Sequence, residues 1–478
     1  MATLESSPKN ATSLKNTFHI CNAVMAAFLL YAALASLTNA VRLARVPFQL
    51  DYEEGNVLNA GVRINAGLTP YAAAGSWPVV LNPYGPIPYH ITAFLIRSVP
   101  PSFFLPRIAI AASAALIAIL VGLITYRFTK SWRIAVSFGA VFLTLPLAQE
   151  WMPVLRVDFM GLAFSLLGLC LFLSARWLKH LAVLFFAGAF FCKVTFVAAP
   201  LACAAVLIKQ KRWRELAYMT VGGVVLLAAA LALLRRSTHG AFLFHQFGTH
   251  VDPWSWGNYS RHTLAVLAES SVLVALALCG IIRLRRFDLP LAYLLMVGVG
   301  TITLFKAGSE SNHLLELEAA LCISAGLGMQ QLQTMRSRAA VVLVVIVGSV
   351  LVVTAMQHRA RYRIGGLVEQ CPQAYAYIQN HQAVLSENVG ALVLTGKPVL
   401  LSNPFVYAQL VRSGKWPNGK IEEMLQERSI DLVMIGKPAI MQQRWSQAAL
   451  AALAANYHPT RQFVCPDAAI AYEPGPKD

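Results

Sequence analysis

The amino-acid sequence predicts an α-helical polytopic membrane protein with a small α/β domain after its last span. Hydrophobic residues make up 57% of the 478 and charged residues only 13%, and the mean hydropathy is +0.57. Soluble domains carry about twice that share of charge. The apolar stretches are continuous and rich in Leu, Ala and Val, whereas the strands of a membrane barrel alternate apolar with polar residues. The spans are therefore expected to be helices, which satisfy their own backbone hydrogen bonds in lipid.

Apolar segments recur along the chain to about residue 357 and give about eleven candidate crossings. A helix needs about 20 residues to cross a bilayer, and several of the segments are shorter. The candidate crossings are 17–41, 103–126, 134–148, 159–175, 181–192, 196–208, 216–234, 264–282, 289–305, 314–332 and 339–356.

The basic residues predict how these helices are oriented. The chain has 39 Lys and Arg against 22 Asp and Glu, a net charge of +17. Most basic residues stand in short clusters between apolar segments, which is typical of cytoplasmic loops and not of a nucleic-acid-binding surface. We therefore expect a cytoplasmic N-terminus and no nucleic-acid partner. The cytoplasmic clusters lie at 9–15, 127–133, 176–179, 209–214, 283–286 and 336–338, with Arg235 and Arg236 as the exceptions.

Two segments leave the number of spans open. The segment 84–97 is apolar but short, and it carries two prolines. A crossing there would reverse the side of every later basic cluster, so we expect a re-entrant or interfacial helix. The segment 181–208 is long for one span and short for two. The basic clusters require an even number of crossings, so we expect two short helices that meet near Lys193.

The composition changes after residue 357, which divides the chain into a membrane part (1–357) and a tail (358–478). The segments 383–387, 398–402 and 431–436 are typical of short buried strands, and 420–429 and 444–457 of amphipathic helices. Such an alternation predicts a small extracytoplasmic α/β domain. Of the eight cysteines, only Cys371 and Cys465 belong to the tail. Outside the cytoplasm they would form a disulfide that ties its two ends, and unpaired thiols are the alternative.

The first long loop, 42–103, places three acidic residues beside the membrane on the non-cytoplasmic side. Asp51, Glu53 and Glu54 stand within four positions. Asp51 has the place of a helix N-cap, and Glu54 three residues on completes a capping-box pattern. On a helix Asp51 and Glu54 would share a face, and Glu53 would point elsewhere. A cap does not exclude catalysis, because a carboxylate fixed at a helix start is also a positioned base.

Two turns place further charges at the same end of the predicted bundle. Arg156 and Asp158 precede a span, where an N-cap Asp with a neighbouring Arg is the simpler interpretation. Lys193 stands among aromatic residues in FFCKVTF. An ammonium there needs an anionic partner or contact with water. Either it has a functional role, or its long side chain reaches the membrane surface.

The segment 304–321 enters a later span with Lys306, Glu310, His313 and Glu316. His313 and Glu316 are three residues apart and share a helix face, so they could hold one ion or one substrate group. As a metal signal this pair is weak, and a polar helix entry is the ordinary interpretation.

The segment 245–256 supplies His245, His250 and Asp252 on the same side, with Trp254 and Trp256. The tryptophans are typical of anchors at the membrane interface. The two histidines and Asp252 are candidates to reach a site formed by the other loops.

Taken together, these features resemble the GT-C class of integral-membrane glycosyltransferases. The resemblance rests on the acidic first loop, the element NPYGPIPYH, the turn with Arg156 and Asp158, the turn with Lys193, and GSESNHLLELE. Bacterial members, including protein O-mannosyltransferases and the lipid A aminoarabinose transferase, are similar in this layout. The chain has no WWDYG-type motif, unlike oligosaccharyltransferases, and no β-trefoil segment, unlike eukaryotic O-mannosyltransferases.

The resemblance implies transfer of a sugar from a polyprenyl-phosphate carrier to an acceptor hydroxyl outside the cytoplasm. The acceptor would be a glycan, a lipid or a protein. A bacterial plasma membrane is the expected location. A hydroxyl nucleophile needs a general base, for which Asp51 is the first candidate, with Glu53 or Glu54 tuning it. Direct displacement would invert the anomeric centre.

A lipid phosphate leaves in this reaction, so cations must neutralise the developing charge. The candidates are Arg156, Lys193 and Lys306, with Asp158 fixing one of them. The 84–97 segment would line the sugar pocket. We expect substrate contacts from Tyr84, Tyr89, His90, His250, Glu310 and His313. Carboxylates are also the ligands that Mg²⁺ or Mn²⁺ would use here, but the sequence requires no metal.

Other functions remain open at this stage. A transporter or flippase of a polar or anionic lipid-linked substrate would also place Lys and Arg within the membrane part, but it should show two related halves, and we find none. A polymerase or ligase would use a diphosphate leaving group. A sensor or assembly protein would use the membrane part as an anchor only.

Overall fold

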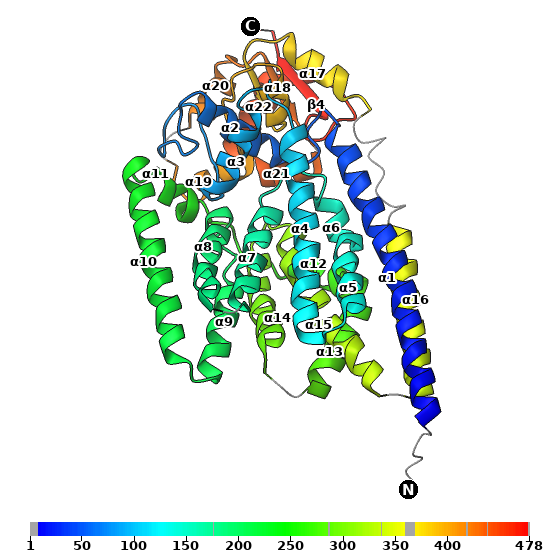
Figure 1. Ribbon diagram of the computed structural model, residues 1–478. Helices are drawn as coiled ribbons and strands as arrows, with labels where there is room; N and C mark the ends of the chain where they lie inside the picture. Colours follow the sequence, from blue (N-terminus) through cyan, green and yellow to red (C-terminus); the bar gives the residue numbers. More distant parts are fainter. Residues whose placement is uncertain are drawn as a thin grey trace.

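The computed structural model describes residues 8–174, 176–284, 287–335, 337–358, 369–416, 419–436 and 438–476. A bundle of apolar helices forms the larger part of the molecule (Figure 1). The tail and the segment 42–103 lie together at one end of this bundle. Helix α1 (Pro8–Ala44) starts at the opposite end and runs up to them.

Each predicted crossing contains an apolar helix. By length and composition, four of the described helices could cross a membrane singly, namely α1, α4, α10 and α16. The number of crossings therefore stays a prediction. The main helices of the later predicted crossings are α4 (Phe104–Thr129), α5 (Trp132–Thr144), α7 (Asp158–Phe172), α8 (Ala182–Cys192), α9 (Ala198–Lys209), α10 (Trp213–Ser237), α13 (Ser271–Leu284), α14 (Leu289–Gly300), α15 (Leu315–Thr334) and α16 (Arg338–His358).

Two predicted crossings are not single straight helices. Helix α5 ends at Thr144, and Pro146 begins the short helix α6 (Pro146–Trp151), because proline cannot donate the backbone hydrogen bond that would continue α5. The predicted segment 264–282 is divided between α12 (Trp256–Glu269) and α13, which meet at a bend of 78°. The predicted crossing is therefore bent, and whether the two helices form one broken span stays a prediction.

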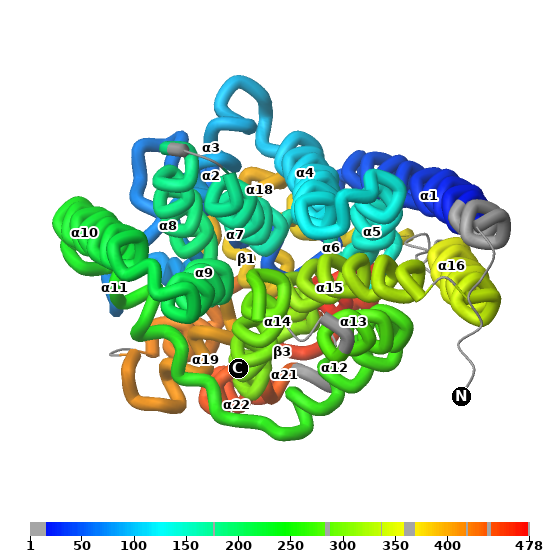
Figure 2. The backbone as a smooth tube through the Cα atoms, turned by 60° about the horizontal axis from the view of Figure 1, so that its bottom comes forward, coloured from blue at the N-terminus to red at the C-terminus, as the bar shows by residue number. Residues whose placement is uncertain are grey.

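The bundle is tightest around α15. Helices α13, α14, α4 and α5 pack against it, and every residue from Leu315 to Met329 is buried. Gly328 allows the close approach of α13, since a Cβ atom there would lie 1.9 Å from the carbonyl oxygen of Leu276. Figure 2 shows α1 and α16 at one edge of the bundle and α10 at the other. The exposed outer faces of α1, α10 and α16 are apolar, as lipid contact requires.

The segment 42–103 forms helices α2 (Glu54–Asn65) and α3 (Pro86–Ile96), which pack on each other at the tail end of the bundle (Figure 1). Pro86 sets the start of α3, where a missing N–H costs nothing. Helix α3 also contacts α4 and α8. Whether it enters a membrane stays a prediction.

The tail is built on a four-stranded sheet with the order β1-β2-β4-β3. Strand β1 (Val384–Ser386) pairs in parallel with β2 (Leu432–Ile435), and β4 (Ile470–Pro474) pairs antiparallel with both β2 and β3 (Tyr457–Gln462). The helices of the tail are α17 (Cys371–Gln379), α18 (Val389–Leu394), α19 (Pro404–Arg412), α20 (Lys420–Gln426), α21 (Pro438–Arg444) and α22 (Gln447–Asn456).

The predicted strands 383–387 and 431–436 are β1 and β2. The prediction of a strand at 398–402 was wrong, because Leu401 only forms an isolated bridge to Val79 of the first loop. Strands β3 and β4 were not predicted. Strand β3 is mostly exposed and contains Pro459, so it lacks the alternation of apolar residues by which a strand is usually predicted. Cys371 and Cys465 are joined in a disulfide, the pairing that the sequence suggested.

The tail shares its core with the segment 42–103. Val79 and Leu81 pack in one apolar cluster with Leu401 and Tyr407. Ser402 donates a backbone hydrogen bond to the Val79 carbonyl at 3.0 Å. The Phe48 ring meets the Tyr375 ring edge-on at 5.0 Å between centroids. The first loop is thereby fixed between the helical bundle and the tail.

Candidate active site

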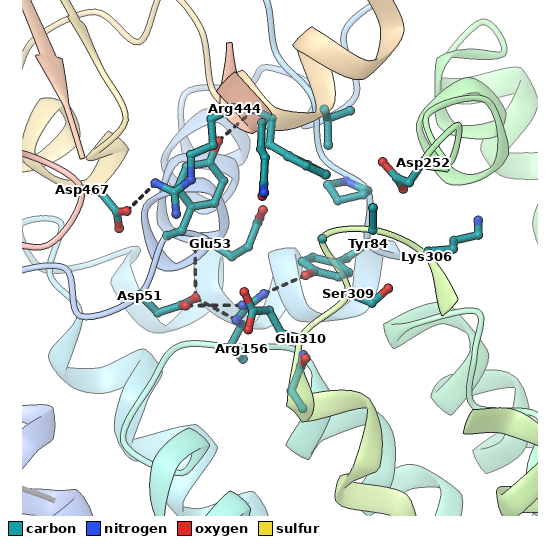
Figure 3. A pocket seen from close by; sticks show the side chains of 18 of the residues that line it. Asp51, Glu53, Tyr84, Arg156, Asp252, Lys306, Ser309, Glu310, Arg444 and Asp467 are labelled. Atoms are coloured by element: carbon teal, nitrogen blue, oxygen red, sulfur yellow. Dashed lines mark hydrogen bonds and ion pairs between the residues drawn. The ribbon is translucent and has the colours of Figure 1, made fainter. Parts of the chain in front are cut away.

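A cavity of about 750 Å³ lies where the bundle, the first loop and the tail meet. The first loop contributes residues 50–53 and 83–84, and the turns between bundle helices contribute Arg156, residues 193–195 and parts of 246–252 and 303–313. The remaining wall comes from the tail, between 405 and 469. Figure 3 shows the charged side chains that face this space. Polar residues far apart in the sequence therefore surround one site.

The start of α2 fixes the acidic residues of the first loop. Asp51 Oδ1 accepts a hydrogen bond from the Glu53 backbone N–H at 3.1 Å. Glu54 Oε2 accepts from the backbone N–H groups of Leu50 at 2.6 Å and Asp51 at 3.3 Å. Helix α2 begins at Glu54, its N-cap residue is Glu53, and no side chain accepts a cap hydrogen bond there, so the interpretation of Asp51 as the helix N-cap was wrong. The two carboxylates instead bond the turn before the helix, and Asp51 lines the cavity.

Glu54 does not line the cavity, which corrects its assignment as a catalytic residue. Its side chain is fully buried and forms an ion pair with Arg107 of α4, at 2.6 Å between Oε2 and Nη2. Oε1 accepts the backbone N–H of Leu155 at 2.6 Å. Asp51 precedes the helix, so the expectation that residues three apart on a helix share a face does not apply to Asp51 and Glu54. Instead, Asp51 and Glu53 are the two acidic residues that face the cavity.

Asp51 is paired with Arg156. The Arg156 Nε lies 2.7 Å from Asp51 Oδ1, and Nη1 donates to the Tyr84 hydroxyl at 3.1 Å. The guanidinium also lies over the Trp151 ring, 4.9 Å from its centroid. Burial raises the pKa of Asp51 to about 7, although the charge of Arg156 opposes this shift. A carboxyl with a pKa near neutrality can take up and release a proton at physiological pH.

Lys193 is held from two sides at the cavity wall. Its Nζ lies 2.8 Å from Asp158 Oδ1 and 3.0 Å from His313 Nε2. Asn312 donates to the other oxygen of Asp158 at 2.8 Å. An ammonium has no acceptor, so His313 must accept at Nε2 and donate at Nδ1 to the Thr303 hydroxyl, 3.0 Å away. Lys193 is only 7% exposed, so it does not reach the outer surface.

Asp158 acts behind the cavity and does not line it. It is the first residue of α7, and its carboxylate caps no backbone N–H there, so the N-cap interpretation was wrong. Its carboxylate is engaged by Lys193 and Asn312 instead. Asp158 therefore positions Lys193, as expected for one of the candidate cations.

Lys306 and Asp252 lie on a third side of the cavity. The backbones of their loops are joined by bonds from Ser255 N–H to the Phe305 carbonyl at 2.6 Å and from Ala307 N–H to the Pro253 carbonyl at 2.9 Å. Burial raises the pKa of Asp252 to about 6, while the nearby Lys306 lowers it. Within the described residues, Lys306 forms no ion pair.

The outer side of these loops is aromatic. Trp254 is 69% and Trp256 77% exposed, and both rings contact Phe305. Their role as anchors at the membrane interface stays a prediction. Exposed tryptophan rings could reach the lipid headgroups, as such anchors do. His250, Glu310 and His313 line the cavity, as the sequence analysis expected of them.

Several candidates do not reach the cavity. Tyr89 is fully buried, and its hydroxyl accepts from the Tyr84 backbone N–H. His90 is exposed on α3 and bonds the Pro86 carbonyl. Both follow the start of α3, and the helix turns them away, so of the predicted sugar-pocket residues in this segment only Tyr84 lines the cavity.

His245 and Glu316 are also held elsewhere. His245 is buried between the Asn82 backbone N–H and the Ala72 carbonyl. Glu316 accepts from the hydroxyls of Ser165 and Tyr293, so it does not join His313. In the described part of the chain, no group of three His, Cys, Asp or Glu side chains could hold a metal ion.

The tail supplies a wall that the sequence did not indicate. Arg444 Nη1 pairs with Glu387 at 2.5 Å and Asp467 at 2.6 Å, and its guanidinium stacks over the Tyr52 ring, 4.0 Å from the centroid. The Phe405 ring reaches Gly308, where φ is +83° and a Cβ atom would lie 2.4 Å from the ring. The one available sequence signal was Cys465, whose disulfide fixes the loop that carries Asp467.

The sequence matches no protein-family model and no curated protein. Solved structures do match. The apo form of ArnT from Cupriavidus metallidurans has a TM-score of 0.64 at 11% identity, over 94% of this chain and 98% of that chain. The same enzyme bound to undecaprenyl phosphate has a TM-score of 0.63 at 10% identity, with the same coverage.

An archaeal relative by structure is the oligosaccharyltransferase AglB from Archaeoglobus fulgidus, in complex with an inhibitory peptide and a dolichol-phosphate. Its TM-score is 0.50 at 11% identity, over 94% of this chain and 74% of that chain. ArnT and AglB are both GT-C glycosyltransferases. The fold is therefore that of the GT-C class, as predicted, and at this identity the likeness establishes the fold alone.

Proposed function

We propose that this protein is a glycosyltransferase that moves a sugar from a polyprenyl-phosphate carrier to an acceptor hydroxyl. The observation that carries the proposal is a single cavity in which Asp51, with a pKa of about 7, lies beside the cations Arg156 and Lys193. Such a site needs a base for the hydroxyl and positive charge for the phosphate. ArnT and AglB, which share the fold, are known with undecaprenyl phosphate and dolichol-phosphate bound.

In the proposed reaction the acceptor oxygen attacks the anomeric carbon of the donor. Asp51 takes the hydroxyl proton, and the bond from that carbon to the phosphate oxygen breaks with its electron pair left on the phosphate. Attack opposite to the leaving group inverts the anomeric centre. Lys193, held by Asp158, and Arg156 stabilise the charge that gathers on the phosphate. Glu53 orients the incoming hydroxyl next to Asp51.

We place this site on the extracytoplasmic face of a bacterial plasma membrane, with the N-terminus in the cytoplasm. The basic turns between α4 and α5 and between α9 and α10 lie at the end of the bundle away from the tail (Figure 1). Positive charge favours the cytoplasmic side. The cavity lies at the tail end, so this orientation presents it to the outside.

The proposal is tested with the full chain in lipid nanodiscs and a panel of radiolabelled polyprenyl-phosphate sugars. Release of sugar from the lipid, slow without acceptor and faster with it, is the expected result. A parallel panel of polyprenyl-diphosphate sugars addresses the polymerase or ligase alternative. If only diphosphate donors turn over, the leaving group assigned here is wrong. If the lipid is moved across proteoliposomes without loss of sugar, the protein is a flippase.

Replacing Lys306 by Gln is expected to raise the donor KM about ten- to a hundredfold with a smaller change in kcat. A charged hydrogen bond to the donor phosphate is lost, which is worth about 1.5–3 kcal/mol. Because Lys306 has no ion pair among the described residues, folding should be unaffected. Lys420→Gln in the tail, where Lys420 pairs with the exposed Glu423, is the matched control. An unchanged KM would remove Lys306 from the phosphate site.

The rate of donor turnover is expected to rise with pH through about 7 and then level off. The base acts in its ionised form, and the fraction of ionised Asp51 falls about tenfold for each pH unit below its pKa. The measurement is kcat/KM between pH 5 and 9 in nanodiscs at constant ionic strength. A rate that falls across pH 7 would assign that ionisation to a general acid instead.

A further inference from the structure

The two sides of the cavity differ in the cations they provide. Arg156, Lys193 and Lys306 come from the turns of the helical bundle, and the tail provides Arg444. In Figure 3 Arg444 and Asp467 lie above Glu53, and Arg156 lies below Asp51. A phosphate donor is therefore attracted to the bundle side.

Arg444 leaves no positive charge for a ligand. It is shared between Glu387 and Asp467 and covers the ring of Tyr52. One guanidinium with two carboxylates has a net negative charge. Asp467 is a cavity residue, and its side chain is only 12% exposed, so this charge is poorly screened by solvent.

Glu53 adds a second negative charge on the same side. Its carboxylate oxygens accept from the amides of Asn56 at 3.1 Å and Asn403 at 2.8 Å. Within the described residues no cation pairs with it. Asn403 belongs to the tail and caps α19 by accepting the Val406 N–H, so the tail itself fixes the direction of Glu53. The Tyr52 and Phe405 rings complete this side of the cavity.

From this arrangement we infer that the tail side is the acceptor subsite, and that it takes an uncharged saccharide hydroxyl and rejects anionic acceptors. The inference rests on the proposed function. In an in-line displacement the acceptor enters opposite the phosphate, which places it against the tail. Aromatic rings, amides and carboxylates suit the apolar faces and hydroxyls of a sugar. On the tail side, a phosphate on the acceptor would meet the carboxylates of Glu53 and Asp467, and Arg444 there is already paired with two carboxylates. The subsite would therefore reject it by charge repulsion.

The test measures binding without turnover. Saturation-transfer NMR on the full chain in nanodiscs that contain polyprenyl phosphate, which occupies the bundle-side cations, compares the neutral disaccharides maltose and chitobiose with glucose 6-phosphate and maltose 1-phosphate. The neutral disaccharides are expected to bind about tenfold more tightly than the sugar phosphates. Asp467→Asn should reduce this preference about three- to tenfold, because it removes one charge near the ligand. Glu423→Gln removes a charge from an exposed site outside the cavity and should leave the preference unchanged.

Phosphates that bind wild type as well as neutral sugars do would overturn the inference, and so would the same response of both variants. No binding of either class would overturn it as well. Donor turnover is measured on the same preparations. If turnover is absent while neutral sugars still bind through the tail side, the proposed transferase fails and the saccharide subsite stands. If turnover is present without the charge preference, only the acceptor assignment fails.

Discussion

Asp51→Asn is expected to lower the rate of donor turnover by about 10²–10⁴, the usual contribution of a general base. The amide cannot accept the proton of the acceptor hydroxyl, and Asn keeps the oxygen that accepts the Glu53 backbone N–H. The start of α2 should therefore survive, and the loss should appear in kcat.

The measurement is loss of labelled sugar from the polyprenyl-phosphate donor, with thermal unfolding recorded on the same sample. Asp431→Asn is the matched control, because Asp431 is exposed in the tail and accepts backbone N–H groups as Asp51 does. A folded Asp51→Asn protein that keeps more than about a tenth of the wild-type rate contradicts a base at this position. The carboxylate of Glu53 would then be the next candidate.

Arg107→Met is expected to lower the free energy of unfolding by about 3–5 kcal/mol. The Arg107 and Glu54 side chains are both fully buried, and Arg107 also donates to the carbonyls of Val46 at 2.6 Å and Phe48 at 2.7 Å. Removing the guanidinium leaves a buried carboxylate without its counter-charge, in the element that positions Asp51.

The readout is thermal or denaturant unfolding in detergent micelles, compared with Arg97→Met, which changes an exposed arginine at the end of α3. Adding Glu54→Gln to Arg107→Met removes the unpaired charge and is expected to recover part of the loss, because Gln still accepts the backbone N–H groups. A single variant as stable as wild type would show that this pair does not hold the first loop in place.

The sequence was informative wherever the signal is local. Apolar runs predicted the helices, and strands β1 and β2 followed from short buried segments. The polar residues at the starts of later spans, Arg156, Lys193 and His313, do line the cavity. They could be identified because an uncompensated charge near lipid is costly, so its presence marks a site.

The sequence failed where a contact between distant residues decides the outcome. Glu53 and Glu54 are neighbours of the same chemistry, and Glu54 leaves the cavity because Arg107, 53 residues away, takes it into the core. Asp158 likewise lies outside the cavity, because it pairs with Lys193, 35 residues away. No local pattern indicates that Arg444 and Asp467 line the cavity.

The sequence by itself therefore determined the membrane class, the helical bundle and the loops from which a site would be built. These follow from hydropathy and from the cost of charge in lipid, which each segment carries alone. Only the tertiary structure decided which carboxylate faces the cavity and that the tail forms one of its walls. Those outcomes depend on partners brought together by folding, because the position of a buried charge is set by the counter-charge that reaches it.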